Sequence, residues 1–233
     1  MEEVGALPPA RDKRESVRTM FDRIAPRYDR MNRLLTGGLD QRWRARALEA
    51  IAVGPGDTVV DLACGTGDLA ELAAARGARA IGVDFAPEML RGAARRRIPA
   101  LLVQADGVRL PLGDGCASAF TCGFALRNFV SLPEIFEEMA RVLASAGRFA
   151  FIEVDRPRHA ALRALHSLYF DRVVPRLGAL LSDRRAYAYL PESTAYLPPG
   201  AELLAQLAKS GFERLHKTPL LLGAVQIVTG VRT

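Results

Sequence analysis

The sequence predicts an α/β fold, with a mostly parallel seven-stranded sheet covered by helices and an antiparallel strand at its C-terminal end. Through the middle of the chain, short apolar runs alternate with helical patterns, which is typical of the β-α units that build parallel sheets. The last two apolar runs are joined by only a few residues, and a connection that short permits only antiparallel pairing.

Five strands are predicted in the alternating region, at 58–63, 80–84, 101–106, 117–126 and 148–153. Helices are predicted between them at 68–76, from Pro87 onward and at 132–143. Pro is favoured in the first turn of a helix, and apolar residues recur at three- and four-residue spacing from Leu132 to Leu143. The C-terminal part is predicted as a helix at 201–210 followed by strands at 212–222 and 225–231.

Two segments fall outside this alternation. Residues 14–52 are predicted to form two helices separated at Thr36-Gly37-Gly38, and residues 158–199 form an insertion that begins with a helix at 160–181. Insertions at strand ends are where α/β proteins build substrate covers. We therefore expect four parts: a helical N-terminal segment packed on the core (1–52), an α/β core (53–157), a substrate-covering insertion (158–199), and a C-terminal helix and strand pair that complete the sheet (200–233).

The composition predicts a cytoplasmic globular protein. Of 233 residues, 49% are hydrophobic and 25% charged, and no apolar run approaches the roughly 18 residues of a membrane-spanning helix. The acidic N-terminus lacks the pattern of a signal peptide. Cys64, Cys116 and Cys122 form no Cys-x-x-Cys pair, so we expect reduced thiols. No spacing of His, Cys or Asp indicates a metal site.

The net charge of +6 is concentrated in residues 11–46, where eleven Arg and Lys face five acidic residues. Such a segment could face solvent, an anionic membrane surface or nucleic acid, and solvent is the simplest interpretation. No RNA-binding motif accompanies it, so nucleic acid is not expected. The apolar stripe of 160–181 could also contact the inner membrane face, although a stripe packed on the core is more common. Peripheral membrane contact and a homodimer are left open.

The stretch Asp61-Leu-Ala-Cys-Gly65-Thr66-Gly67-Asp68 joins the first predicted strand to the first helix. Gly65 and Gly67 allow the backbone to approach a ligand closely, and a helix N-terminus favours a negative ligand group. Because Gly65-x-Gly67-x-x-Ala70 also fits the dinucleotide fingerprint, the glycines alone leave NAD(P) and S-adenosylmethionine (SAM) open.

Acidic residues at three successive strand ends favour SAM. Asp61 would repel a pyrophosphate but would attract an ammonium and a sulfonium. Asp84 suits ribose hydroxyls, and Asp106 suits an adenine amino group. Phe85 or Met89 is expected to pack on the adenine. The sequence therefore predicts a Rossmann-like, class I SAM-dependent methyltransferase fold with SAM as its cofactor.

Several longer stretches extend this pattern: Phe21-Asp-Arg-Ile-Ala-Pro-Arg-Tyr-Asp-Arg-Met-Asn32, Gly38 with Trp43, the glycine loop, Phe124-Ala-Leu-Arg-Asn128 and Tyr187-Ala-Tyr-Leu-Pro-Glu-Ser193. From about Val17 to the C-terminus the chain resembles the ubiquinone/menaquinone biosynthesis C-methyltransferases. The resemblance implies methylation of a ring carbon of a prenylated quinol precursor, foremost demethylmenaquinol. It also implies that Thr66, Asp84 and the Asp106-Gly107 pair contact SAM.

The chain departs from that family pattern at three places. Ala125 stands where Gly is usual, Gly123 replaces a Ser that would face the cofactor, and Asp40-Gln41 replaces His-Arg. Two alternatives therefore stay open: a methyltransferase of another small aromatic or polyketide ring, and a non-catalytic SAM-fold partner subunit.

Arg127 and Asn128 end an apolar run, where a charge and an amide are costly unless something uses them. A ring carbon becomes nucleophilic when its neighbouring hydroxyl loses or shares a proton. Arg stays protonated, so we predict that Arg127 stabilises the developing oxyanion and that Asn128 orients the ring hydroxyl. The alternative is a structural cap, with Arg127 paired with backbone carbonyls or Glu134.

The proton acceptor is left open among several groups. The candidates are His159, His166, His216 and Asp29, together with the lid tyrosines Tyr28, Tyr187 and Tyr189. The three tyrosines are also the predicted substrate contacts.

Overall fold

A seven-stranded sheet forms the centre of the protein, in the order β3-β2-β1-β4-β5-β7-β6. The computed structural model describes residues 10–157, 159–169, 172, 189 and 193–233, apart from the side chains of 10–12, 165 and 166. The strands are β1 (Thr58–Leu62), β2 (Arg79–Asp84), β3 (Ala100–Gln104), β4 (Ala117–Gly123), β5 (Leu143–Val154), β6 (Phe212–Leu220) and β7 (Val225–Arg232). The strand pairs β3–β2, β2–β1, β1–β4 and β4–β5 are parallel. β7 is antiparallel to both of its neighbours, β5 and β6. The predicted sheet is confirmed.

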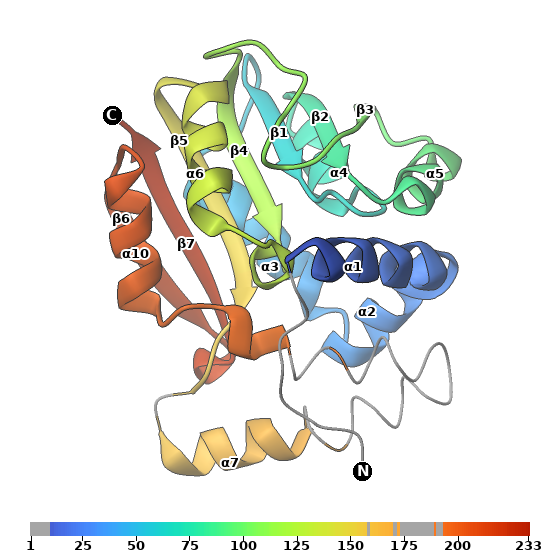
Figure 1. Ribbon diagram of the computed structural model, residues 1–233, viewed down its shortest axis with the longest axis vertical. Coiled ribbons are helices and arrows are strands. Elements are labelled where there is room, and N and C mark those ends of the chain that lie inside the picture. The colour runs from blue at the N-terminus through green and yellow to red at the C-terminus, as the bar shows by residue number, and fades with distance from the viewer. Residues whose placement is uncertain (1–9, 158, 170–171, 173–188, 190–192) are drawn as a thin grey trace.

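Helices cover both faces of this sheet (Figure 1). The helices of the structure are α1 (Ala10–Ile24), α2 (Tyr28–Thr36), α3 (Leu39–Ala50), α4 (Asp68–Ala75), α5 (Pro87–Arg96), α6 (Leu132–Val142), α7 (Ala160–Leu168) and α10 (Gly200–Lys209). Phe149 and Phe151 of β5 pack in the cluster that holds α6 and α10. Ala150 and Ile152 pack in the cluster that holds α3 and α4. Successive side chains of a strand point to opposite faces, so one strand supplies both cores.

The prediction of two helices over 14–52 is wrong, because the structure has α1, α2 and α3 there, with the 3-10 turn η1 (Ala25–Arg27) between the first two. Pro26 lies in that turn and has no N–H to continue a helical ladder. The predicted break at the glycines is confirmed. Gly37 and Gly38 have φ values of 58° and 78°, the left-handed conformation that ends α2 and precedes α3. Of the helix predicted at 160–181, the structure has α7, and most of the remainder lies outside the described residues.

The sheet presents one switch point, because β1 pairs with β2 on one side and with β4 on the other. Ligands of open α/β sheets bind at the carboxyl ends of the strands at such a point. In Figure 1, α1 and α2 lie across these strand ends. The N-terminal segment therefore covers the place where a ligand is expected.

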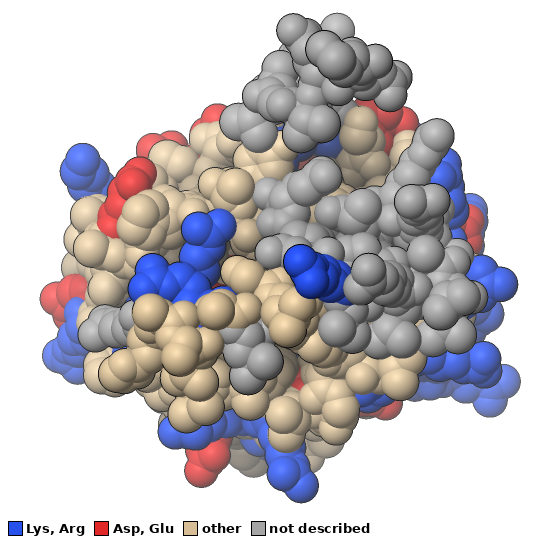
Figure 2. All heavy atoms as spheres, turned by 90° about the horizontal axis from the view of Figure 1, so that it is seen from below, with Lys and Arg blue, Asp and Glu red and all other residues tan. Residues whose placement is uncertain are grey.

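Much of the N-terminal positive charge is used inside the protein. Asp40 and Asp68 are 1% and 6% exposed. Arg33 and Arg44 form ion pairs with both carboxylates, and Arg96 pairs with Asp68. On the face seen in Figure 2, Lys and Arg side chains are scattered over the rim and the middle of the face and do not gather in one patch. Within the described ranges, no helix has the length and apolar character needed to cross a bilayer.

Candidate active site

Two cavities meet at the carboxyl ends of β1 and β4. We call the smaller one, of about 370 Å³, the polar cavity, and the larger one, of about 690 Å³, the apolar cavity. Both are lined by Phe21, Tyr28, Phe124 and Asn128. Ligands in the two cavities would therefore face each other across these shared residues.

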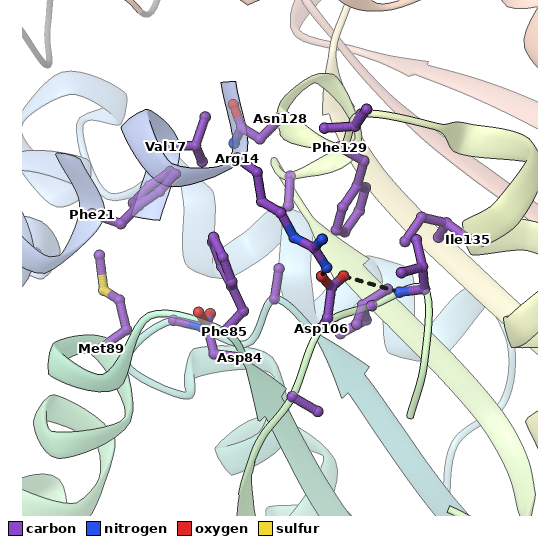
Figure 3. A pocket seen from close by; sticks show the side chains of 18 of the residues that line it. Arg14, Val17, Phe21, Asp84, Phe85, Met89, Asp106, Asn128, Phe129 and Ile135 are labelled. Carbon is purple, nitrogen blue, oxygen red and sulfur yellow. Dashed lines mark hydrogen bonds and ion pairs between the residues drawn. The ribbon is translucent and has the colours of Figure 1, made fainter. Parts of the chain in front are cut away.

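Most of the predicted cofactor residues line the polar cavity: Gly65, Asp84, Phe85, Met89, Asp106, Gly107 and Gly123. Asp61 and Thr66 line a small recess beside Gly65. Gly67 lines neither cavity. Figure 3 shows Asp84, Phe85 and Met89 on the sheet side of the polar cavity and Val17 and Phe21 on α1 across from them. The structure thus brings together residues that lie far apart in the sequence.

The glycine loop needs its two glycines for different reasons. Gly65 has φ 58°, and a Cβ there would lie 3.7 Å from the Tyr28 ring, on the cavity side of the loop. Gly67 has φ 92°, and a Cβ there would lie 2.2 Å from Cδ1 of Ile98, inside the protein. Gly65 therefore allows a ligand to approach, whereas Gly67 allows the loop to pack.

Asp84 holds the loop in place while facing the polar cavity. Its Oδ2 accepts a hydrogen bond from the Gly65 N–H at 2.7 Å, and its Oδ1 accepts one from the Ala86 N–H at 2.8 Å. Burial raises the pKa of the Asp84 carboxyl to about 6. A carboxylate has about four acceptor positions, so two backbone bonds leave capacity for ribose hydroxyls.

Asp61 is only 1% exposed and incompletely satisfied. Oδ1 accepts from the Thr121 hydroxyl at 2.8 Å, whereas Oδ2 has no hydrogen-bond partner among the described residues. Burial raises the pKa of the Asp61 carboxyl to about 7. An unsatisfied buried acceptor costs free energy, and an ammonium group at the recess would supply the missing donor. This orphaned oxygen is what fits the site to the amino-acid end of SAM.

A side chain of the N-terminal helix α1 covers the Asp106 carboxylate. This carboxylate is ion-paired with Arg14 of α1, and Oδ1 accepts from the Val108 N–H at 3.2 Å (Figure 3). Arg14 thus occupies the neighbourhood predicted for an adenine amino group. Thr66 also contacts the N-terminal segment, because its hydroxyl donates a hydrogen bond to Asp29 of α2.

The apolar cavity is built from α1, α2, α3, α7 and the connection between β6 and β7. Two of the three tyrosines predicted as substrate contacts, Tyr28 and Tyr189, line it, whereas Tyr187 lies outside the described residues. Burial raises the pKa of the Tyr28 hydroxyl, so Tyr28 is suited to donate a hydrogen bond rather than to accept a proton. His159 and His216 are exposed and line neither cavity, and the side chain of His166 is outside the described set. Asp29 lines neither cavity and is ion-paired with Arg96.

The turn after β4 directs Arg127 into the apolar cavity. The strand predicted to reach Leu126 ends at Gly123, because Phe124 is left-handed with φ 60° and the 3-10 turn η2 (Leu126–Asn128) follows. Arg127 Nη1 is hydrogen-bonded and ion-paired to Glu153 Oε1, and Nε donates to the Ser193 hydroxyl at 3.1 Å. The alternative prediction that Arg127 pairs with Glu134 is therefore wrong. Glu134 lines the polar cavity instead. No described residue accepts a hydrogen bond from Nη2, which leaves that nitrogen available to a ligand oxygen.

Asn128 forms part of the wall between the cavities. Its Oδ1 is buried and has no hydrogen-bond partner among the described residues. The neighbouring turn is fixed by Lys13 of α1, which donates to the carbonyls of Arg127 at 3.3 Å and of Phe129 at 2.8 Å. Its ammonium also lies 4.0 Å from the centre of the Tyr196 ring. The backbone around Asn128 is therefore held, while its amide keeps capacity for a ligand.

Three residues of this arrangement were missed from the sequence: Glu153, Ser193 and Lys13. Glu153 ends the predicted fifth strand beside the fourth, so the adjacency of parallel strand ends was a usable signal. Ser193 closes the Tyr-x-Tyr-Leu-x-Glu-Ser stretch. Lys13 is one of many N-terminal cations, and no local pattern distinguishes it.

A model of the ubiE/COQ5 methyltransferase family matches residues 10–232. The chain belongs to this family. It is 38% identical over 225 residues to the ubiquinone/menaquinone biosynthesis C-methyltransferase of Syntrophotalea carbinolica, covering 94% of this chain and 95% of that protein. It is 41% identical over 231 residues to the demethylmenaquinone methyltransferase of a Roseiflexus species, covering 97% of each.

The fold is shared with solved methyltransferases. A SAM-dependent methyltransferase from Aquifex aeolicus superposes with a TM-score of 0.64 at 14% identity, over 88% of this chain and 98% of that one. The predicted family, fold and methyltransferase activity are confirmed, and so is SAM as the methyl donor.

Proposed function

We propose that the protein transfers a methyl group from SAM to a ring carbon of a prenylated quinol, converting demethylmenaquinol to menaquinol. The observation that carries this proposal is the pair of cavities, one with carboxylates at its edges and one apolar with Arg127 at its buried end, that share Asn128 and Tyr28. Relatives that bear the name demethylmenaquinone methyltransferase support the choice of ring.

The polar cavity and the recess beside Gly65 together supply a separate partner for each part of the cofactor. Asp61 suits the ammonium and Asp84 suits the ribose hydroxyls. Asp106 suits the adenine amino group once the Arg14 side chain moves away from its carboxylate. When bound, SAM supplies a methyl group that is already activated on a sulfonium. The protein must therefore mainly position the acceptor and exclude water. Val17 and Phe21 of α1 suit the second task, because they close the polar cavity with apolar side chains.

The apolar cavity supplies the groups that act on the acceptor ring. A phenolic hydroxyl has a pKa of about 10, and a fixed cation beside it favours the oxyanion that makes the adjacent carbon nucleophilic. Arg127 stays charged, and its Nη2 has no described acceptor, so we assign it to the ring oxygen. Asn128, with an unsatisfied buried amide oxygen in the shared wall, orients the ring hydroxyl.

A prenylated quinol is carried by a bilayer, so the enzyme has to meet its acceptor at a membrane surface. The predicted peripheral contact at the inner membrane face and the predicted homodimer stay predictions. Of the basic side chains expected to face outward, Arg33 and Arg44 are paired with buried carboxylates and are not available for such a contact.

Quinone profiling of a strain that lacks the gene tests the proposal. The expected result is accumulation of a quinone lighter by one methyl group, with recovery of the normal quinone when the gene is restored. An unchanged quinone pool would instead favour methylation of another aromatic ring. Recovery by a folded variant that does not bind SAM would favour the non-catalytic partner subunit.

A further inference from the structure

The connection between β6 and β7 carries two unfavourable features at one place. Leu221 and Leu222, in the 3-10 turn η5 (Leu221–Gly223), are 53% and 74% exposed. Both are left-handed, with φ values of 44° and 55°. Left-handed backbone is unfavourable for a non-glycine residue, and such strain clusters at ligand clamps. Hairpin connections usually place Gly, Asn or Asp at positions of this kind.

The position of these leucines indicates what they serve. Both line the apolar cavity, as does Leu34 of α2, which is 52% exposed. We call Leu34, Leu221 and Leu222 the rim leucines. Arg127, which lines the same cavity, is only 6% exposed. The cavity is therefore lined both by a buried cation and by exposed apolar side chains.

Much of the remaining lining is apolar and includes Ile24, Leu35, Trp43 and Leu162, beside the polar side chains of Asn32, Thr36, Asp40 and Arg44. The cavity is nearly twice as large as the polar cavity, about 690 Å³ against about 370 Å³, although a quinol ring is a smaller group than SAM. A ring held at Arg127 therefore leaves room in a cavity that the rim leucines also line.

We propose that the rim leucines bind the ring-proximal part of the hydrocarbon tail of the acceptor and so select acceptors that carry such a tail. This inference rests on the proposed function, because it places the acceptor ring at Arg127. The tail lies along the apolar walls and leaves the protein between η5 and α2. Contact with a ligand offsets the exposure of Leu221 and Leu222, which the described packing leaves uncompensated.

The test compares acceptors with no tail, one isoprene unit and two isoprene units, all supplied in detergent micelles. Leu222→Asn removes the apolar surface and keeps a residue that tolerates left-handed backbone. We expect it to lower kcat/KM for the tailed acceptors about tenfold and to leave the tail-less acceptor unchanged, since only the tailed acceptors bury the leucine side chain. Leu101→Asn is the matched control, because Leu101 of β3 is 54% exposed and lines neither cavity.

A binding measurement separates this inference from the proposed function. Trp43 is the only tryptophan of the chain and lines the apolar cavity, so a bound quinone should quench its fluorescence. Affinity that rises with tail length in the wild type, and rises less in Leu222→Asn, supports the tail site even for a ring that is not methylated. Equal losses with and without a tail, or a loss seen in vesicles but absent in micelles, would overturn it, the latter in favour of membrane docking.

Discussion

Arg127 and Glu153 form a buried ion pair between the ends of two neighbouring strands, with Nη1 of the guanidinium bonded to Oε1 of the carboxylate. Their side chains are 7% and 1% exposed. The second carboxylate oxygen accepts the Arg127 backbone N–H at 3.4 Å, and Ser193 accepts from Nε. These contacts fix the guanidinium plane while leaving Nη2 without a described acceptor. Arg127 therefore combines a structural pairing with a guanidinium nitrogen that has no described acceptor, on a residue that lines the apolar cavity.

This pairing changes how the role of Arg127 has to be tested. Removing one partner of a buried ion pair costs roughly 3–5 kcal/mol, because the other charge stays buried and uncompensated. Arg127→Ala is therefore expected to melt lower whether or not Arg127 acts on the acceptor. Only turnover measured per folded molecule separates the two roles.

We predict that Arg127→Ala lowers the single-turnover rate about a hundredfold or more, the scale of losing one oxyanion donor. Arg127→Lys keeps the charge but loses the planar fork, so it should also be slow. SAM affinity should hardly change in either variant, because Arg127 does not line the polar cavity. Rate, SAM affinity and melting temperature are measured on one preparation. A folded Arg127→Ala protein with the wild-type rate would exclude the catalytic role.

SAM affinity should depend on pH through Asp61. Burial raises the pKa of its carboxyl to about 7, so in the absence of ligand Asp61 is mostly protonated below that pH. An ammonium pairs with the ionised form, so binding has to displace this proton. Affinity should be full above about pH 7 and fall as the pH decreases, by up to about tenfold per pH unit.

Calorimetry in buffers of different ionisation enthalpy measures the proton released on binding. Asp61→Asn is the control, because it cannot ionise and should bind SAM more weakly with a flatter pH profile. The pKa of Asp84, raised to about 6 by burial, contributes only at lower pH. A wild-type affinity that is constant from about pH 8 to about pH 6 would contradict the assignment of Asp61.

Asp84→Ala should weaken SAM binding by about 1–3 kcal/mol, since it removes a charged acceptor for the ribose hydroxyls. The same substitution also releases the Gly65 and Ala86 N–H groups, so part of the loss comes from a looser loop. Asp84→Asn keeps one acceptor oxygen and should fall between alanine and the wild type. If calorimetry found tight NADH binding and no SAM binding, the assignment of the glycine loop would be wrong.

The two loop glycines should separate binding from stability. Gly65→Ala places a methyl group on the cavity side and should weaken SAM binding, with a loss of stability that comes only from the backbone strain at φ 58°. Gly67→Ala places one 2.2 Å from Ile98 Cδ1 and should mainly lower the free energy of unfolding, by about 1–3 kcal/mol. In an Ile98→Ala background, where the clashing methyl group is gone, Gly67→Ala should cost less than in the wild type, because only the backbone strain at φ 92° remains. Unfolding and SAM titrations measure the two effects, and equal behaviour of the two single variants would contradict this division.

The sequence sufficed for the sheet and most of the polar cavity, because both depend on local patterns. Apolar runs place the strands, and Asp84 and Asp106 follow strand ends, where parallel strands bring side chains to one edge. Pro26 is a local signal for the break between α1 and α2, and the prediction of two helices missed it. The pairings of Arg127 with Glu153 and of Asp106 with Arg14 join segments far apart in the chain. Such contacts depend on how helices cross the strand ends, which no short stretch specifies.

The most direct test of the account is the mass and position of the label after one turnover with SAM that carries a deuterated methyl group and demethylmenaquinol as acceptor. The account predicts a product heavier by one labelled methyl group on a ring carbon, which still oxidises to the quinone because both ring oxygens stay free. A label on a ring oxygen would block that oxidation and contradict C-methylation, and so would the absence of any labelled quinone from a folded protein that binds both SAM and the acceptor.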